Sequence, residues 1–188
     1  MTPRPAPHPP VRADTAACAR LIEAAYALGV PRDYGRARGL RRTREPKQLV
    51  FIGFDTQNRS QWLSPRPARA WSRMRDAAAR DGVQLQIVSA FRSVEYQLGI
   101  LKRKLERGQT IEQILRVSAA PGYSEHHSGR ALDITTHGCA ALEEEFEHSA
   151  AFGWLATNAQ SYGFRLSYPR GNRNGIAYEP WHWCWNAR

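Results

Sequence analysis

The sequence has few cysteines, and their spacing fixes neither a compartment nor a redox role. Cys18, Cys139 and Cys184 are the three present, and no two of them form a CxxC pair of the kind that binds zinc. An odd number leaves at least one thiol unpaired, so cysteine usage indicates neither an oxidising nor a reducing compartment. The roles and redox states of the three thiols therefore stay open.

Long hydrophobic runs are also absent. No apolar stretch approaches the roughly 18–20 residues that a membrane helix needs. The first 20 residues are rich in proline and contain no apolar segment of the signal-peptide kind, so no secretory signal is expected in this sequence. A transmembrane segment is not expected either.

Acidic residues are scarce relative to basic ones. The 188 residues include 17 acidic and 27 basic side chains, which gives a formal net charge of +10. Such a charge favours an anionic partner, and nucleic acid, anionic lipid and the bacterial cell wall all qualify. The alternative is a solvated basic surface with no specific partner. The hydrophobic content of 42% and the charged content of 23% are those of a soluble globular protein.

The order of the expected elements predicts an α+β fold, in which helices pack on a small and mostly antiparallel sheet. Helices are expected at residues 14–28, 64–80, 93–108, 110–118 and 149–163. Strands are expected at residues 49–54, 84–89, 131–135, 164–168 and 176–185, with the first of them buried.

A domain boundary is expected near residue 48. Residues 1–48 would form a proline- and arginine-rich extension with one helix, and residues 49–188 would form the main domain. Within the extension, residues 32–47 are rich in arginine and show no apolar period. We expect them to form an exposed basic loop.

Metal-ligating side chains are concentrated in residues 124–133, which read SEHHSGRALD. Histidine offers a neutral nitrogen ligand and aspartate an anionic oxygen ligand, a combination that suits zinc. His126 and Asp133 can converge if the chain turns at Gly129 into a strand that carries the aspartate. The neighbouring His127 is expected to lie at the surface or to contact the site from outside the ligand set.

A third ligand has to come from another part of the chain, and residues 178–185, which read YEPWHWCW, are the best source. Along a strand in this segment, the histidine faces one side and the tryptophans face the other, so the histidine can point into a cleft. Three protein ligands leave one position of zinc open, as catalytic sites require. We therefore predict Zn²⁺ as the cofactor, with His126, Asp133 and His182 as its ligands. Glu179 is predicted to be the general base.

Three segments together resemble the VanY-type zinc D-alanyl-D-alanine carboxypeptidases. SEHHSGRALDI resembles the SxHxxGxAxD motif of that family, and EPWHW resembles its ExxH motif, in which an aromatic residue follows the histidine. SAFRSVEYQ, residues 89–97, resembles the segment S-G-[YF]-R-S-x-x-x-Q, with Ala90 replacing the usual glycine. The resemblance covers about residues 49–185. It implies a hedgehog/DD-peptidase-like fold, a small antiparallel sheet flanked by helices.

The resemblance also implies roles for residues around the metal. Glu179 would act as base and later as acid. Arg92 would lie beside the scissile bond and stabilise negative charge there, since a guanidinium is always charged; a structural salt bridge is the alternative. Gln97 and Ser124 would hydrogen-bond the terminal D-residue or its carboxylate, unless their roles are purely structural.

The reaction that the resemblance implies is hydrolysis of the terminal peptide bond of a peptidoglycan stem peptide. The expected partner is thus peptidoglycan, and the expected location is the periplasm or the cell wall. An LD-carboxypeptidase or a peptidoglycan endopeptidase would use the same metal and base, so the preferred stem stays open, as does the oligomeric state.

Three other classes of protein compete with a zinc peptidase. A zinc-binding module without catalysis is disfavoured because Glu179 and Arg92 are both present. A basic nucleic-acid binder that uses residues 32–47 is supported by no helix-turn-helix or RNA-binding signature. A cysteine peptidase would need Cys184 and His182 to act as a dyad, and their positions on one face of one strand make that unfavourable. Cys184 is expected to be an inert buried thiol rather than a competing metal ligand.

Overall fold

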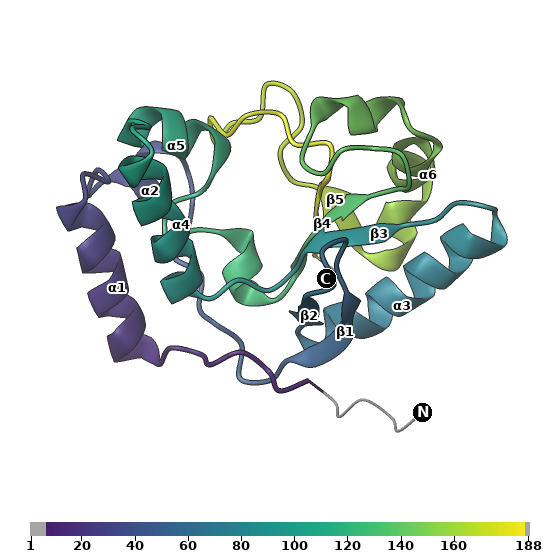
Figure 1. Cartoon of the computed structure of the whole chain (residues 1–188), viewed down its shortest axis with the longest axis horizontal. Coiled ribbons are helices and arrows are strands. Elements are labelled where there is room, and N and C mark those ends of the chain that lie inside the picture. The colour runs from purple at the N-terminus through teal and green to yellow at the C-terminus, as the bar shows by residue number, and fades with distance from the viewer. Residues whose placement is uncertain (1–6, 187–188) are drawn as a thin grey trace.

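The structure is a computed structural model that describes residues 7–186, and Figure 1 shows the order of its elements. The α-helices are α1 (Thr15–Ala27), α2 (Tyr34–Ala37), α3 (Pro65–Arg80), α4 (Val94–Glu106), α5 (Ile111–Val117) and α6 (Ala150–Asn158). The strands are β1 (Val50–Phe54), β2 (Ser60–Leu63), β3 (Gln86–Ser89), β4 (Ala131–Thr135), β5 (Phe164–Leu166) and β6 (His182–Trp185). The short 3-10 helices are η1 (Glu125–Ser128), η2 (Glu144–His148) and η3 (Ala159–Tyr162).

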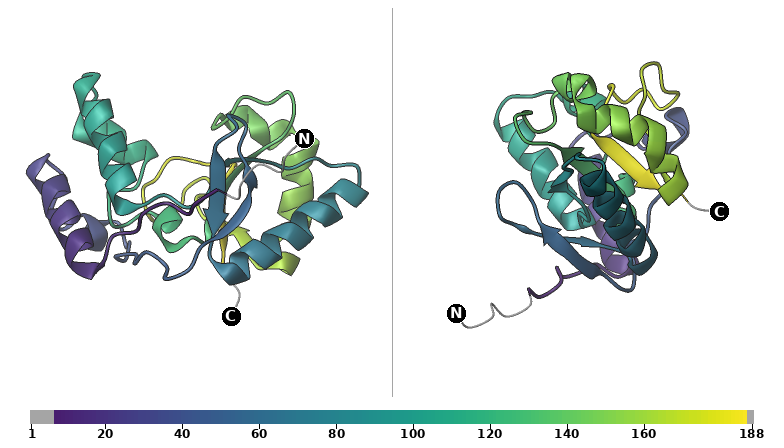
Figure 2. Two further views of the ribbon diagram at one scale, coloured as in Figure 1. Left: turned by 60° about the horizontal axis from the view of Figure 1, so that its bottom comes forward. Right: turned by 90° about the vertical axis from the view of Figure 1, so that its right-hand side faces the viewer.

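The main sheet is antiparallel and has the strand order β3-β4-β6-β5, while β1 and β2 pair in a separate antiparallel hairpin. Figures 1 and 2 show α3 and α6 together at one end of the molecule and α1, α4 and α5 at the other, with the main sheet between them. The predicted α+β class, with helices around a small antiparallel sheet, is confirmed. No helix within residues 7–186 combines the length and the apolar character needed to cross a membrane.

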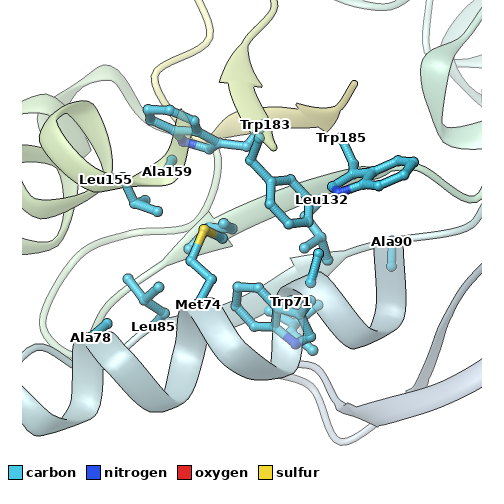
Figure 3. Packing of buried hydrophobic residues seen from close by; sticks show 14 of the residues in the cluster. Trp71, Met74, Ala78, Leu85, Ala90, Leu132, Leu155, Ala159, Trp183 and Trp185 are labelled. Carbon is cyan, nitrogen blue, oxygen red and sulfur yellow. The ribbon is translucent and has the colours of Figure 1, made fainter. Parts of the chain in front are cut away.

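One hydrophobic core lies between α3, α6 and one face of the main sheet (Figure 3). Trp71, Met74 and Ala78 share one face of α3 because they are spaced at i, i+3 and i+7. They meet Leu132 of β4 and Trp183 of β6, and all five are buried. Since side chains alternate along a strand, the neighbours of Leu132 and Trp183 face away from this core. That opposite face of the sheet carries the site described below.

A second core joins the N-terminal segment to α4 and α5. Ala25 of α1 and Leu101 of α4 are both buried in it, and so is Tyr34. The Tyr34 hydroxyl also accepts a hydrogen bond of 3.3 Å from the backbone N–H of Ala120. The expectation of an exposed loop over residues 32–47 is therefore wrong around α2, because an aromatic side chain holds this part against the helices. The domain boundary near residue 48 stays a prediction.

Side-chain caps begin most of the helices where the sequence places them. Asp14 accepts a hydrogen bond of 2.7 Å from the N–H of Ala17, and Ser93 accepts one of 3.0 Å from that of Tyr96. Ser64 also precedes its helix, but its hydroxyl instead donates to the carbonyl of Ser128 over 2.9 Å. The start of α3 is thus tied to the segment that carries the candidate metal ligands.

The hairpin of β1 and β2 differs from the expectation in two ways. The expected first strand is present, but Val50 and Phe54 at its ends are 42% and 44% exposed, so it is not a buried strand. β2 was not predicted, although Trp62 and Leu63 within it are buried. β1 pairs only with β2 and lies outside the main sheet, which explains the exposure of its ends.

The last strand is shorter than expected. It was predicted over residues 176–185, yet β6 begins only at His182. Pro180 lacks the N–H that a strand partner requires. In its place the chain makes a turn, in which the N–H of His182 donates to the carbonyl of Glu179 over 3.1 Å. Glu179 is therefore a turn residue.

Candidate active site

Asp133 and His182 meet across two neighbouring strands of the main sheet. They are direct partners in the antiparallel register of β4 and β6. Nδ1 of His182 lies 3.0 Å from Oδ1 of Asp133, and both side chains are buried. The strand register thus brings together two groups that are 49 positions apart in the sequence.

His126 reaches the same point from η1. The backbone turns into β4 at Gly129, which has the left-handed angles φ 64° and ψ 27°. A Cβ added there would lie 2.7 Å from the Ser64 hydroxyl, so both the conformation and the space favour glycine. Nε2 of His126 lies 3.2 Å from Oδ2 of Asp133, while its Nδ1 is paired with the carbonyl of Ala90. The predicted turn at Gly129 is confirmed.

These three side chains fit a metal ion. One ligand atom from each of His126, Asp133 and His182 lies within 4.8 Å of the other two. Nε2 of His126 is buried and lies 3.2 Å from Oδ2 of Asp133, yet it forms no hydrogen bond within residues 7–186. A metal ion would satisfy this polar atom. Two imidazole nitrogens and one carboxylate oxygen are a donor set that zinc accepts, with one coordination position left for solvent or substrate.

The ionisable groups of the cluster shift one another's pKa values. Burial opposes ionisation of Asp133, but the nearby charge of His126 and the hydrogen bond of His182 hold its pKa well below the usual range. Burial also opposes protonation of His182, yet its hydrogen bonds to Asp133 and Glu125 raise its pKa to about 10. Burial and the Arg92 charge lower the pKa of His126 to about 4.

Glu179 lies beside this cluster, in the turn before β6. Its Oε2 is 3.7 Å from Nδ1 of His182, and its backbone N–H donates to the carbonyl of Tyr168 over 3.1 Å. Burial raises its pKa to about 7, and the Asp133 charge adds to the rise, although the charge of His182 opposes it. A carboxyl group with this pKa can both take and return a proton near neutral pH.

Arg92 contacts the ligand set directly. Its guanidinium lies 3.4 Å from Oδ2 of Asp133 and 3.4 Å from the side-chain oxygen of Gln97. The Gln97 amide nitrogen donates to the Ser118 hydroxyl and to a backbone carbonyl, at 2.9 and 3.0 Å. The Ser124 hydroxyl accepts from the N–H of His126 over 3.3 Å. Arg92, Gln97 and Ser124 thus lie around the cluster, and their substrate roles stay predictions.

His127 does not lie at the surface. The residue is fully buried, and its ring is held at both nitrogens. Nδ1 is 2.7 Å from the carbonyl of Arg92, and Nε2 accepts from the N–H of Gly122 over 3.1 Å. The surface interpretation is wrong because the turn of η1 directs this ring inward. His127 instead fixes the backbone of Arg92 from outside the ligand set.

Cys184 is a buried thiol at the far end of β6. Burial raises its pKa well above the ordinary value, and the charge of Glu125 adds to the rise. The thiolate form that a cysteine nucleophile or a metal ligand needs is therefore disfavoured. This supports the expectation of an inert thiol.

A cleft of about 370 Å³ opens onto the cluster and is lined by all the predicted site residues. Sequence reasoning missed Lys104 and Tyr168, which also line it. The ring of Tyr168 lies against that of His182, with centroids 4.8 Å apart. Their positions depend on how α4 and β5 pack, for which no local pattern gives a signal. Glu125 was missed too, although it stands beside His126 within the predicted motif.

The model of the VanY family, described as D-alanyl-D-alanine carboxypeptidase, matches residues 60–188. The chain belongs to the VanY family. YodJ of Bacillus subtilis is 33% identical over 147 residues, an alignment that covers 73% of this chain and 53% of YodJ. The chain therefore spans about half the length of this relative.

Two solved structures support the membership in the VanY family. The LD-carboxypeptidase LdcB is 32% identical, with a TM-score of 0.68, and the match covers 75% of this chain and 69% of LdcB. A variant of the vancomycin-resistance D,D-pentapeptidase VanY, solved in complex with Zn(II), is 27% identical with a TM-score of 0.57. That match covers 79% of this chain and 87% of the VanY chain. The expected VanY family is confirmed, and the His–Asp–His cluster agrees with the expected zinc cofactor.

Proposed function

We propose that this VanY-family chain is a zinc-dependent D-alanyl-D-alanine carboxypeptidase that hydrolyses the terminal peptide bond of peptidoglycan stem peptides. The observation that carries the proposal is the buried cluster of His126, Asp133 and His182 beside Glu179, whose pKa is raised to about 7. A structural zinc site needs no such group, since it is closed by four ligands and has no proton to move.

The metal and the base have separate tasks. A zinc ion held by His126, Asp133 and His182 would supply Lewis acidity, which polarises a carbonyl and lowers the pKa of a water molecule. Glu179 takes a proton from the attacking water and then delivers it to the departing amino group of the terminal residue. Its raised pKa suits both transfers, because the carboxyl group changes its protonation state near neutral pH.

Arg92 stabilises negative charge on the substrate. Its side chain is 21% exposed and lines the cleft, so the guanidinium remains accessible from the side on which a peptide would enter. Its N–H groups donate to Asp133 and Gln97 only over 3.4 Å, which leaves donor capacity for a carbonyl oxygen. The backbone of Arg92 is fixed by His127, so the charge is held in place before the substrate arrives.

The second candidate function is LD-carboxypeptidase activity on tetrapeptide stems. The specific observation that favours it is the similarity to LdcB, which has the higher TM-score of the two solved structures described above. Both activities would use the same ligands and base, and they would differ in the residue that precedes the scissile bond. An endopeptidase would differ in accepting a substrate that continues past this bond.

The basic character of the chain agrees with an anionic wall as its environment. The net charge of +10 would concentrate the protein near acidic polymers through long-range attraction. We therefore place its action at the cell wall or in the periplasm, where the proposed substrate is found.

Defined stem peptides test the proposal. The zinc-loaded protein is incubated with pentapeptide, tetrapeptide and tripeptide stems, and the products are separated and weighed by mass spectrometry. Loss of one D-alanine from the pentapeptide alone is the expected result, and loss from the tetrapeptide alone would assign the LD activity. Removal of zinc with a chelator should abolish the reaction, and zinc should restore it. A zinc-loaded protein that cleaves no stem would overturn the proposal.

A further inference from the structure

The two histidine ligands each have a partner on the ring nitrogen that points away from the cluster. Nδ1 of His126 is paired with the backbone carbonyl of Ala90. Nε2 of His182 lies 2.9 Å from Oε2 of Glu125. The remaining nitrogens, Nε2 of His126 and Nδ1 of His182, are those that face Asp133. The two rings therefore present opposite nitrogens to the same point.

We propose that Glu125 is a positioning residue that holds His182 with Nδ1 directed to the metal. The inference rests on the proposed zinc site and concerns no group that touches the substrate. A carboxylate on the outer nitrogen of a metal-bound histidine fixes its tautomer and orientation and makes the ring a better ligand. Glu125 would do this for His182, while the Ala90 carbonyl does it for His126.

Glu125 is directed to this task by η1. Ser124 begins this 3-10 helix and Gly129 ends it, so Glu125 and His126 leave the backbone in different directions. His126 points to Asp133, and Glu125 points to the outer edge of the His182 ring. The Glu125 side chain is 25% exposed, while that of His182 is 3% exposed. A buried ring and a mostly buried carboxylate form a hydrogen bond that water screens little.

Two observations separate Glu125 from the base and from the ligands. The cleft is lined by Glu179, and Glu125 is not among the described residues that line it. The set of close ligand atoms contains His126, Asp133 and His182 without Glu125. The imidazole ring of His182 stands between Glu125 and Asp133, with one nitrogen bonded to each. Glu125 therefore acts on the metal only through His182.

The partner of His182 is anionic, whereas that of His126 is a neutral carbonyl. A hydrogen bond to a carboxylate is stronger than one to an amide carbonyl, because the acceptor carries a full charge. Removing the Glu125 acceptor would therefore leave Nε2 of His182 without its hydrogen-bond partner. Within residues 7–186, no backbone carbonyl accepts a hydrogen bond from this nitrogen in its place. His182 would lose its orientation, and zinc affinity would fall.

A matched pair of variants tests the inference. Glu125→Gln keeps an acceptor oxygen at nearly the same place, and Glu125→Met has similar length but accepts no comparable hydrogen bond. Zinc dissociation constants are measured by competition with a chromogenic chelator. We expect Glu125→Met to weaken binding by about 10–100-fold, and Glu125→Gln to weaken it much less. Glu112→Met, at an exposed position of α5 that does not line the cleft, should bind zinc like the unchanged protein.

Two further measurements keep the test independent of folding and of catalysis. In the unchanged zinc-loaded protein, the nitrogen NMR shifts of the histidines should show His182 bound through Nδ1 with a proton on Nε2. Cobalt in place of zinc should give a d–d spectrum that changes in Glu125→Met and is kept in Glu125→Gln. Ligation of His182 through Nε2, or equal zinc affinity of both variants, would overturn the inference. A protein that binds zinc in this way but cleaves no stem peptide would refute only the proposed function.

Discussion

Nδ1 of His182 lies 3.0 Å from Oδ1 of Asp133 because the two residues are direct partners in the antiparallel pairing of β6 with β4. A shift of this register by one residue would turn one of the two side chains to the opposite face of the sheet. The same register places Trp183 opposite Leu132 in the hydrophobic core. Packing of the core on one face of the sheet thus holds the candidate metal ligands in place on the other.

Glu179→Ala should keep the metal and lose the reaction. The side chain lies 3.7 Å from His182 but is not needed for the ligand set, so zinc content should stay at the level of the unchanged protein. Loss of a general base lowers the rate by about 10²–10⁴-fold. D-alanine release and zinc content by mass spectrometry check both parts. Glu112→Ala, an exposed carboxylate on α5, is the control with unchanged rate. Full turnover by Glu179→Ala would remove this residue from the mechanism.

Zinc affinity should rise with pH. The pKa of His182 in the metal-free chain is raised to about 10, so this ring carries a proton at pH 7 that zinc must displace. Below the raised pKa, a one-proton exchange makes the apparent affinity about tenfold weaker for each unit that the pH falls. Calorimetry between pH 6 and pH 8, in buffers of different ionisation enthalpy, measures the protons released. Zinc binding without proton release in this range would contradict the assignment of the charge to His182.

Arg92→Lys should reduce kcat more than it raises KM. Lysine keeps the positive charge but lacks the planar fork that contacts Asp133 and Gln97. If the guanidinium stabilises charge in the transition state, its loss costs about 10²–10³-fold in kcat. Steady-state kinetics on the pentapeptide stem measure both constants. Arg107→Lys, an exposed residue directly after α4, serves as the control. An effect on stability alone would assign Arg92 to a structural salt bridge.

Gly122→Ala should destabilise the fold by contact with α1. Gly122 has φ +87°, and a Cβ there would lie 2.5 Å from the Ile22 side chain. Gly138 has the similar angle φ +83° with nothing within 4 Å of such a Cβ. Both variants carry the backbone strain, and only Gly122→Ala adds overpacking, which costs about 1–3 kcal/mol. Chemical denaturation compares them. An equal loss of unfolding free energy in both variants would show that α1 is not packed firmly against the loop that contains Gly122.

Much of the site follows from residue types and local turns. One motif supplies His126 and Asp133, and a later strand supplies His182. The ligand atoms of these three predicted residues lie within 4.8 Å of one another. The turn at Gly129 was also predictable, since its left-handed conformation is one that glycine adopts at little cost. Helix starts at Asp14 and Ser93 follow from the same kind of local chemistry.

Other features depended on contacts between distant segments. The burial of His127 follows from its bonds to Arg92 and Gly122, and no local pattern separates it from a surface histidine. β2 has no strong local signal, and it becomes a strand through its pairing with β1. The last strand begins at His182, which pairs with Asp133 of β4, and from Trp183 onward it also pairs with β5.

The sequence by itself determined which side chains could hold zinc and which carboxylate could move a proton, because these properties belong to the residue types and to the turns between them. Only the tertiary structure decided that Glu125 points to the outer nitrogen of His182, and that burial raises the pKa of Glu179 to about 7. Both depend on how strands and loops from separate parts of the chain exclude water and direct side chains, and no short stretch of sequence contains that information.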